Sequence, residues 1–486
     1  MIHTFEIYYE LNYRSAAYCV GNLNRIAREY GPVNGRPRYF SDTKINEYLT
    51  GDRKSLRFST EFLFLGLHHI KFTKMPLPDG RATYYIYFRI EPEVLLTQEY
   101  SLNLFQCNEN NFDALQSRYG EIVYQIFPRS MEQRPIEGSI DFMPVAERRY
   151  IRDLEYRIKY GELAGEELEI YRFRHLFSLP YLGLARIARV DFTVDFHCDH
   201  PDIYLRLAKQ SYVDNASRKR KLYLKKGKYL AAYNKTVDGF LIYDKQKKYM
   251  LPRFDNKPNI EELRRAAANV MRIEYVFKCR SRREQLRFTR LNHPAKGQIE
   301  YESTPGLCGL MPYIIQDVGA ERLRNEYYRL IGGGQWMSDY HWNNTLEQSS
   351  LTKTMKRKLN NLAYLISEVR HLDRSKAAFA QGRDIQRYRG PGTLHVQGSK
   401  DMFRTHIDKI RSLGLQPLRI PETDFFKDNG RQVTHVSSDF DNFTRVDLGV
   451  EHHEIIEWAA EDRYIIPVYE STVADLKALY NRYRPR

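Results

Sequence analysis

The clearest pattern in the chain is a strict alternation of apolar and polar residues in IARVDFTVDF, residues 187–196. A period of two is typical of a strand that buries one face. The apolar positions are Val190, Phe192, Val194 and Phe196, and the polar positions are Arg189, Asp191, Thr193 and Asp195. The pattern therefore predicts a half-buried strand whose open face is acidic.

The segments that follow predict two helices and three further strands. Asp238-Gly239 is a hairpin signal between a basic segment that ends in a β-compatible stretch and the run GFLIYDKQ. The next segment is rich in Ala, Glu and Arg, which favours a helix, and VMRIEYVFKCR alternates again. In chain order we expect a strand at 187–196, a helix at 200–212, a strand ending near 236, a strand at 239–246, a helix at 258–270 and a strand at 270–280.

This β-α-β-β-α-β order predicts an α+β fold built on a ferredoxin-like, palm-like antiparallel sheet. In that topology the first strand lies between the third and the fourth, and both helices cover one face of the sheet. The other face stays open. Polar residues from three adjacent strands are therefore expected to gather on one patch.

The chain of 486 residues is long enough for two or three domains. A helix expected at 350–372 is basic at its start, which makes Lys353, Lys356, Arg357 and Lys358 candidate DNA contacts. We expect four consecutive segments: a β-rich N-terminal region at 1–150 that packs on the catalytic unit, a catalytic core at 151–300, a basic helical segment at 301–380 and a small α/β C-terminal domain at 381–486.

The formal net charge of +15 indicates an anionic partner, and nucleic acid is the usual partner of so basic a protein. No apolar stretch approaches the roughly 20 residues that span a bilayer, and the N-terminus carries no secretion signal, so neither a membrane nor export is expected. The five cysteines are scattered and form no CxxC pair, which fits a reduced cytoplasm and argues against a zinc site.

Several familiar sites do not match the sequence. GPGTLHVQGSK, residues 390–400, has the wrong spacing for a P-loop, so no helicase motor is expected. The His clusters at 195–200 and 451–454 match no zinc or metalloprotease spacing. LHHI at 67–70 lacks the His-hydrophobe-His pattern with which many single-strand nickases hold their metal. If the chain nicks DNA, it needs other ligands.

Chemistry is expected where the three strands meet. The first strand offers Asp191 and Asp195, the fourth offers Glu274, and the third offers Tyr243 and Lys245. Carboxylates without His or Cys are hard oxygen ligands that suit Mg²⁺ or Mn²⁺. Such a metal would polarise a phosphodiester for attack by Tyr243, with Lys245 placed to favour the phenolate or to hold the phosphate. The structural alternative is that these residues are solvated positions of a one-sided sheet.

A basic segment with an interleaved tyrosine, Tyr223, has the composition of a groove that grips a DNA backbone and stacks bases on aromatic rings. The alternative is an exposed charged loop. The candidate DNA-binding residues are Arg218, Lys219, Arg220, Lys221, Lys225, Lys226 and Lys228.

Three segments, ARVDFTVDF, FLIYDKQ and MRIEYVF, resemble the gene II protein family of filamentous phages, which initiates rolling-circle replication. They are more distantly similar to plasmid initiators with an R-x-D, Y-[DN]-K and R-x-E arrangement. The resemblance covers roughly residues 85–290 and, more faintly, 390–470.

The resemblance implies that a tyrosine nicks the plus strand at a double-stranded replication origin, leaving a free 3′-OH primer and a 5′ end held on the protein. The nucleophile then falls on Tyr243, the metal ligands on Asp191 and Glu274, and the basic helper on Lys245. It also implies a host helicase and polymerase as partners, in the host bacterial cytoplasm.

Some alternatives stay open. The family pattern does not require an acid at Asp195, and AAYNKT offers Tyr233 as a rival nucleophile on a strand expected at the sheet edge. A palm-type primase or polymerase also carries metal-binding carboxylates on a ferredoxin-like sheet and would be indifferent to Tyr243→Phe. A non-catalytic origin-binding protein would bind DNA without cutting it.

Overall fold

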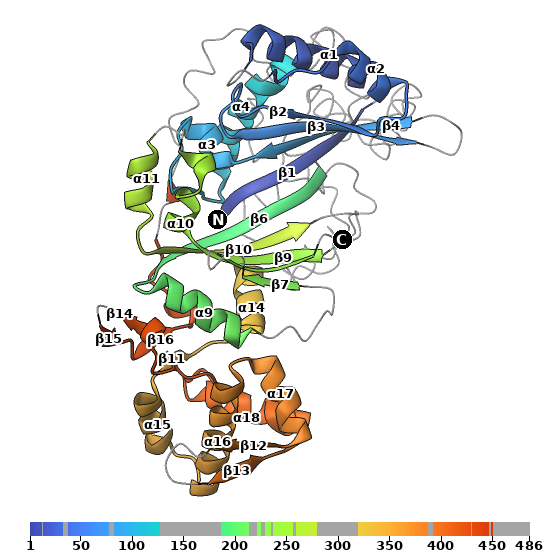
Figure 1. The fold of residues 1–486 in the computed structure, drawn as a ribbon. Coiled ribbons are helices and arrows are strands. Elements are labelled where there is room, and N and C mark those ends of the chain that lie inside the picture. The colour runs from blue at the N-terminus through green and yellow to red at the C-terminus, as the bar shows by residue number, and fades with distance from the viewer. Residues whose placement is uncertain are drawn as a thin grey trace, which may run out of the picture. The chain divides into compact units, whose positions relative to one another are not determined.

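The computed structural model describes residues 1–11, 13–32, 37–76, 82–126, 186–212, 221–224, 229–234, 237–255, 259–278, 319–386, 392–428, 430–446 and 449–450. Helices and mostly antiparallel strands are combined in this fold (Figure 1). Two compact units form, one from residues 1–192, 277–319 and 448–486 and the other from 193–276 and 320–447. The four segments expected from the sequence were consecutive, whereas each unit combines segments that are distant along the chain.

The first unit contains a sheet with the strand order β2-β3-β4-β1-β6. Strand β4 shows why these segments are strands, since Tyr84, Ile86, Phe88 and Ile90 are buried and the residues between them are half-buried. The strands are β1 (Ile2–Leu11), β2 (Ser55–Ser59), β3 (Leu67–Pro76), β4 (Ala82–Ile90) and the start of β6 (Arg186–His197), with two short strands beside them, β5 (Leu104–Phe105) on β1 and β17 (Gly449–Val450) on β5.

Helices α1, α2 and α4 lie on one side of this sheet in Figure 1. Helix α1 buries Ala16, Cys19, Val20, Leu23 and Ala27, whose spacing of three to four residues is that of one helix face. The helices of the unit are α1 (Tyr13–Tyr30), α2 (Asp42–Leu49), α3 (Pro92–Thr97) and α4 (Glu109–Ile126).

The second unit contains the strand order β6-β10-β9-β8-β7. Its strands are the end of β6, β7 (Lys221–Leu224), β8 (Tyr229–Asn234), β9 (Val237–Asp244) and β10 (Val270–Lys278). The ferredoxin-like order predicted from the sequence is wrong here. It places β6 between β9 and β10, whereas β10 lies between β6 and β9. Residues 270–277 of β10 are buried without interruption, so both faces of this strand are covered. Strand β8 is also not at the edge, because β7 pairs with it.

Helix α9 (Pro201–Ser211) packs Ile203, Tyr204 and Leu207 into the core of this unit. The hydroxyl groups of Tyr204 and Tyr327 are 2.7 Å apart, which joins α9 to α14. The other helices around the sheet are α10 (Lys245–Tyr249), the 3₁₀ turn η2 (Pro252–Phe254), α11 (Ile260–Ala266) and α14 (Ala320–Leu330).

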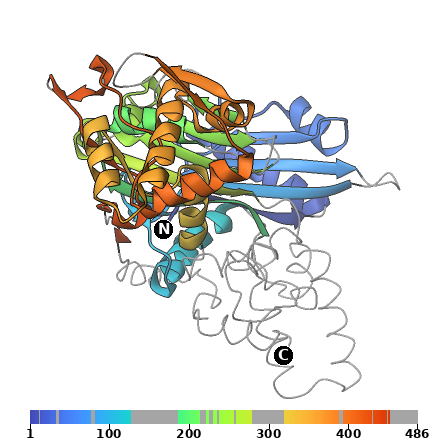
Figure 2. The same cartoon turned by 90° about the horizontal axis from the view of Figure 1, so that it is seen from below.

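The rest of the second unit is a helical module, coloured gold to orange in Figures 1 and 2. Its core consists of Trp342, Leu346, Leu359, Ala363, Ile410 and Leu415. The module contains α15 (Asp339–Gln348), α16 (Lys353–Val369), α17 (Leu372–Gln381), the hairpin strands β12 (Arg383–Gln386) and β13 (Thr393–Val396), and α18 (Lys400–Ser412). The short elements around it are β11 (Gln335–Met337), η5 (Asp424–Phe426), β14 (Lys427–Asp428), β15 (Arg431–Gln432), β16 (His435–Ser437) and η6 (Phe440–Asn442).

Buried Arg419 stabilises this module from within. Its guanidinium lies 4.2 Å from the ring centroid of Trp342 and 4.1 Å from that of Tyr364, and it donates to Asp339 at 2.9 Å. A planar cation between two aromatic rings combines burial with electrostatic attraction. These contacts hold α15 and α16 in a fixed arrangement. None of the helices in the described ranges is long and apolar enough to cross a membrane.

Candidate functional site

Tyr243 lies between an acceptor and a cation. The pairing of β9 with β10 places it opposite Arg272, and Glu274 lies two residues further along β10 on the same face. The Tyr243 hydroxyl donates to Glu274 Oε1 at 2.6 Å, and Lys248 Nζ donates to the Tyr243 oxygen at 3.1 Å. The predicted proximity of Tyr243 and Glu274 is therefore confirmed. A nucleophile within hydrogen-bond reach of a base is the arrangement that covalent catalysis requires.

Burial determines the protonation state of this group. Tyr243 is 8% exposed and Glu274 is 4% exposed. Burial raises the pKa of Tyr243 well above its usual value, and the charge of Glu274 raises it further, while Arg272 opposes the shift. At neutral pH the side chain is thus a phenol, and its proton is directed at Glu274. Any reaction at the oxygen has to move this proton to an acceptor, and Glu274 is in place to receive it.

Lys245 does not stand beside the Tyr243 hydroxyl as predicted. Strand β9 ends at Asp244, whose side chain accepts from the backbone N–H of Lys247 at 3.1 Å and caps helix α10. Lys245 is the first residue of that helix; it is buried, with its Nζ 5.0 Å from the ring centroid of Tyr249. The prediction assumed that the strand continued through Lys245. Because a helical turn follows instead, Lys248 takes that place.

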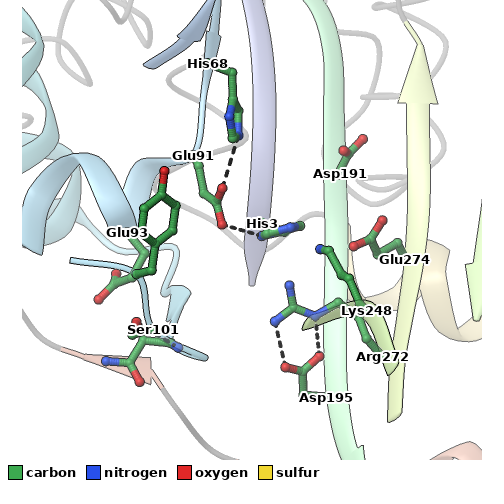
Figure 3. A network of polar contacts seen from close by, with 12 residues as sticks. His3, His68, Glu91, Glu93, Ser101, Asp191, Asp195, Lys248, Arg272 and Glu274 are labelled. Carbon is green, nitrogen blue, oxygen red and sulfur yellow. Dashed lines mark hydrogen bonds and ion pairs between the residues drawn. The ribbon is translucent and has the colours of Figure 1, made fainter. Parts of the chain in front are cut away.

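Asp195 is engaged in a buried ion pair. Arg272 donates to both of its carboxylate oxygens at 2.6 Å, and the two side chains are 0% and 1% exposed (Figure 3). Although burial alone would lower the pKa of Arg272, Asp195 holds it well above its usual value. The pair joins β6 to β10. The predicted role of Asp195 as a metal ligand does not fit these contacts.

Asp191 is held in the same way in the first unit. Arg189, two residues earlier on the same face of β6, donates to both carboxylate oxygens at 2.6 Å, and Asp191 is 2% exposed. The expected open acidic face is therefore buried and compensated by arginine. Among the described residues no group of three or more His, Cys, Asp or Glu could hold a metal ion. The residues predicted as ligands do not fit a Mg²⁺ or Mn²⁺ site in this arrangement, because each aspartate is occupied by a guanidinium.

Other predicted residues fall partly outside the described ranges. Tyr233 lies on β8 opposite Lys221 of β7, but nothing of their side chains is described. The remaining candidate DNA-binding residues, Arg218, Lys219, Arg220, Lys225, Lys226 and Lys228, lie outside the described residues.

A second polar cluster, in the first unit, was missed by the sequence reasoning. His3 of β1 and His68 of β3 both point at Glu91, which precedes helix α3 (Figure 3). His3 Nδ1 is 3.4 Å from Glu91 Oε1, and His68 Nε2 is 3.1 Å from Glu91 Oε2. On its other side, His68 Nδ1 is 3.6 Å from Glu61, which also accepts a hydrogen bond from Tyr100. The four groups His3, His68, Glu91 and Glu61 form one network, which we call the histidine–glutamate network.

A close backbone approach holds the histidine–glutamate network in place. The Glu91 N–H donates to the carbonyl of Gly66 at 2.8 Å. Gly66 has φ +86°, and a Cβ there would lie 2.4 Å from the backbone nitrogen of Leu95. Only glycine allows β3 and α3 to approach so closely. The contact brings Glu91 against His68 although the two are far apart in the chain.

The two neighbouring histidines have opposite electrostatics. Burial lowers the pKa of His68, but the hydrogen bonds and charges of Glu61 and Glu91 outweigh this and raise it to about 9. Burial, followed by the charges of Arg57 and Arg89, lowers the pKa of His69 to about 3. At neutral pH His68 is thus an imidazolium between two carboxylates, while His69 is neutral. The network therefore holds a proton on His68 at neutral pH.

Comparison with protein-family models, curated proteins and solved structures found no match to this chain.

Proposed function

We propose that this protein nicks and rejoins DNA through Tyr243 and so initiates rolling-circle replication. The proposal depends on one observation: the Tyr243 oxygen lies between Glu274 at 2.6 Å and Lys248 at 3.1 Å. Glu274 accepts the phenol proton, and the phenolate attacks the phosphorus of a DNA phosphodiester. The bond from phosphorus to the 3′ oxygen breaks, and that oxygen takes up a proton and leaves as a free 3′-OH. The 5′ phosphate stays linked to Tyr243, and joining is the reverse reaction.

Charge supports this proposal. An attacking phenolate and a pentavalent phosphoryl group carry negative charge that has to be stabilised. The Lys248 ammonium lies 5.0 Å from the Tyr243 ring centroid, and the net charge of +15 favours binding of a polyanion. The similarity of three segments to the filamentous phage gene II family points to the same chemistry.

The metal requirement stays a prediction. Asp191 and Asp195 are each held by an arginine, so no catalytic step is assigned to a metal bound by them. Chelation with EDTA, followed by addition of Mg²⁺ or Mn²⁺, tests whether the reaction needs a divalent cation. A palm-type polymerase is disfavoured, because it needs carboxylates that are free to share metal ions with a nucleotide.

A non-catalytic DNA-binding protein is the second candidate. Tyr243 is 8% exposed, and the neighbouring Asp195 is fully paired, which also fits a core that only stabilises the fold. The two functions differ in one product. Only the nicking enzyme forms a covalent link between protein and DNA.

The experiment is a search for that link. The full-length protein is incubated with Mg²⁺ or Mn²⁺ and a labelled pool of single-stranded oligonucleotides with a randomised centre, and adducts that survive boiling in detergent are collected. We expect a 5′-phosphotyrosine at Tyr243 by peptide mass spectrometry and no adduct with Tyr243→Phe. An adduct on another residue would refute the assignment of Tyr243. No adduct, together with tight binding of the pool, would favour the non-catalytic function.

A further inference from the structure

The N-terminal end of helix α16 has a charge distribution that opposes the helix dipole. Its first two turns contain Lys353, Lys356, Arg357 and Lys358 and no acidic residue. Its last turn contains Glu368, and its C-cap residue is Arg370. Cations are favourable at the C-terminus of a helix and unfavourable at its N-terminus, by about 0.3–1 kcal/mol each. The stability of helix α16 therefore does not explain why these cations are present. Binding of a ligand to them would explain it.

Three of these cations are available to a ligand. Lys353, Arg357 and Lys358 are exposed, and none forms an ion pair with an acidic side chain in the part of the chain that the structure describes. Lys356 differs, because its Nζ contacts the backbone carbonyl and the carboxylate of Glu347. Lys353 and Arg357 are four residues apart, so they lie on one face, about 6 Å apart along the axis.

Helix α18 adds a fourth cation, Lys409. Leu359 of α16 and Ile410 of α18 lie in one hydrophobic core, so their chain neighbours Lys358 and Lys409 stand on two packed helices. Burial, followed by the positive charges of Lys358 and Lys409, lowers the pKa of His406. His406 is 6% exposed and packs on Phe379, with ring centroids 6.3 Å apart. The cations of two packed helices thus act on one buried imidazole ring, that of His406. We call Lys353, Arg357, Lys358 and Lys409 the α16–α18 patch.

Most acidic residues of α15, α16 and α18 are paired with other cations. Glu347 is paired with Lys356, Glu368 with Arg383 at 3.3 Å, and Asp401 with Arg404 at 3.9 Å. Asp408, exposed beside Lys409, is the acidic neighbour on α18. The patch therefore presents an excess of positive charge.

We propose that the α16–α18 patch binds the phosphate backbone of duplex DNA. Duplex DNA carries one negative charge per about 1.7 Å of its axis, so a rigid row of cations gains by displacing counterions. A single-strand platform needs exposed aromatic rings for base stacking, and Phe379, the ring that packs on His406, is 3% exposed. The module has its own hydrophobic core and is rigidified by Arg419, as a docking surface requires.

This inference deepens the proposed function: it adds a duplex contact to a nicking enzyme. The two can fail separately, because duplex binding is measured without cleavage and adduct formation is measured on single strands. Duplex binding is expected to survive in Tyr243→Phe.

The test compares two triple variants of the full chain with equal net charge. The patch variant is Lys353→Gln, Arg357→Gln and Lys358→Gln. The control removes three exposed cations of the same unit that are ion-paired, Arg383→Gln, Arg404→Gln and Lys427→Gln. Anisotropy of a labelled duplex of about 30 base pairs, three helical turns, is recorded between about 50 and 200 mM salt.

We expect the patch variant to reduce the slope of log K against log salt by about 2 to 3 and the control to reduce it by less than about 1. The thermal midpoint of the patch variant should stay equal or rise, because the removed charges oppose the helix dipole. An unchanged slope would overturn the proposal. An equal loss in both variants would also overturn it, because net charge alone would then explain binding. A loss confined to single-stranded DNA of the same sequence would refute the duplex assignment.

Discussion

Lys248 lies five residues beyond Tyr243 in the chain, and its Nζ donates to the Tyr243 hydroxyl oxygen at 3.1 Å. The contact exists because β9 ends at Asp244 and the chain turns at once into helix α10, which returns residue 248 toward the strand. A strand that continued straight would place Lys245 and Lys247 beside Tyr243 and carry residue 248 away from it. The cation of the candidate site therefore depends on the Asp244 cap.

The first prediction follows from that contact. Lys248→Met keeps the aliphatic stem and removes the ammonium that would stabilise a phenolate and the attacked phosphate. We expect adduct formation to slow by about 100-fold, the effect of removing one preorganised donor. The rate is measured in single turnover on a labelled oligonucleotide. Lys247→Met is the matched control; Lys247 pairs with Asp202 and should lose less than threefold, on the order of a surface contact.

The second prediction concerns the nucleophile. Tyr243→Phe should fold, bind DNA with near-normal affinity and form no adduct. It removes one hydrogen-bond donor from the buried Glu274 carboxylate, so the free energy of unfolding should fall by about 1–3 kcal/mol. Tyr233→Phe should retain most of the activity. If Tyr233→Phe is inactive and Tyr243→Phe nicks normally, the nucleophile is Tyr233.

The third prediction tests the role of Asp195. Because Asp195 is fully buried against Arg272, Arg272→Met should destabilise the protein by about 3–5 kcal/mol by leaving an uncompensated carboxylate. The double variant Arg272→Met with Asp195→Leu should recover most of that loss in urea denaturation. For Asp195→Asn we expect no change in the concentration of Mg²⁺ that gives half-maximal adduct formation. A shift of that concentration would make Asp195 a ligand after all.

Local elements were predictable from the sequence because their signals are local. Alternation gave β6 within one residue at each end, and Pro201 marked the start of α9. Alternation also predicted that Tyr243 and Glu274 share a face, which their hydrogen bond confirms. The same alternation could also have predicted the ion pair of Arg189 with Asp191, because residues two apart on a strand lie on one face.

Strand order and the histidine–glutamate network were not predictable, because both depend on contacts between distant segments. The predicted and the observed strand orders are both compatible with the same order of elements along the chain. The burial of β10 on both faces is visible only in the folded protein. His68 meets Glu91 through the close approach at Gly66. The spacing of His68 and Glu91 in the sequence does not reveal their contact, because the turn at Gly66 and the start of helix α3 bring the two side chains together.

The last prediction uses that network. His68 has a folded pKa of about 9, above its ordinary 6.5 in the unfolded chain, because Glu61 and Glu91 surround it. A raised histidine pKa contributes stability that is fully present below about pH 6.5 and is lost as the pH rises through about 9. One pKa unit corresponds to about 1.4 kcal/mol, so the free energy of unfolding should fall by on the order of 2–3 kcal/mol across that window.

His68→Gln should lower stability at pH 6 and flatten the dependence between pH 6.5 and 9, as measured by urea denaturation at each pH. The control is His69→Gln. Because the pKa of His69 is lowered to about 3, this variant should keep the pH dependence of stability between pH 6.5 and 9. A wild-type protein with constant stability from pH 6.5 to 9 would show that His68 is not charged between the two carboxylates.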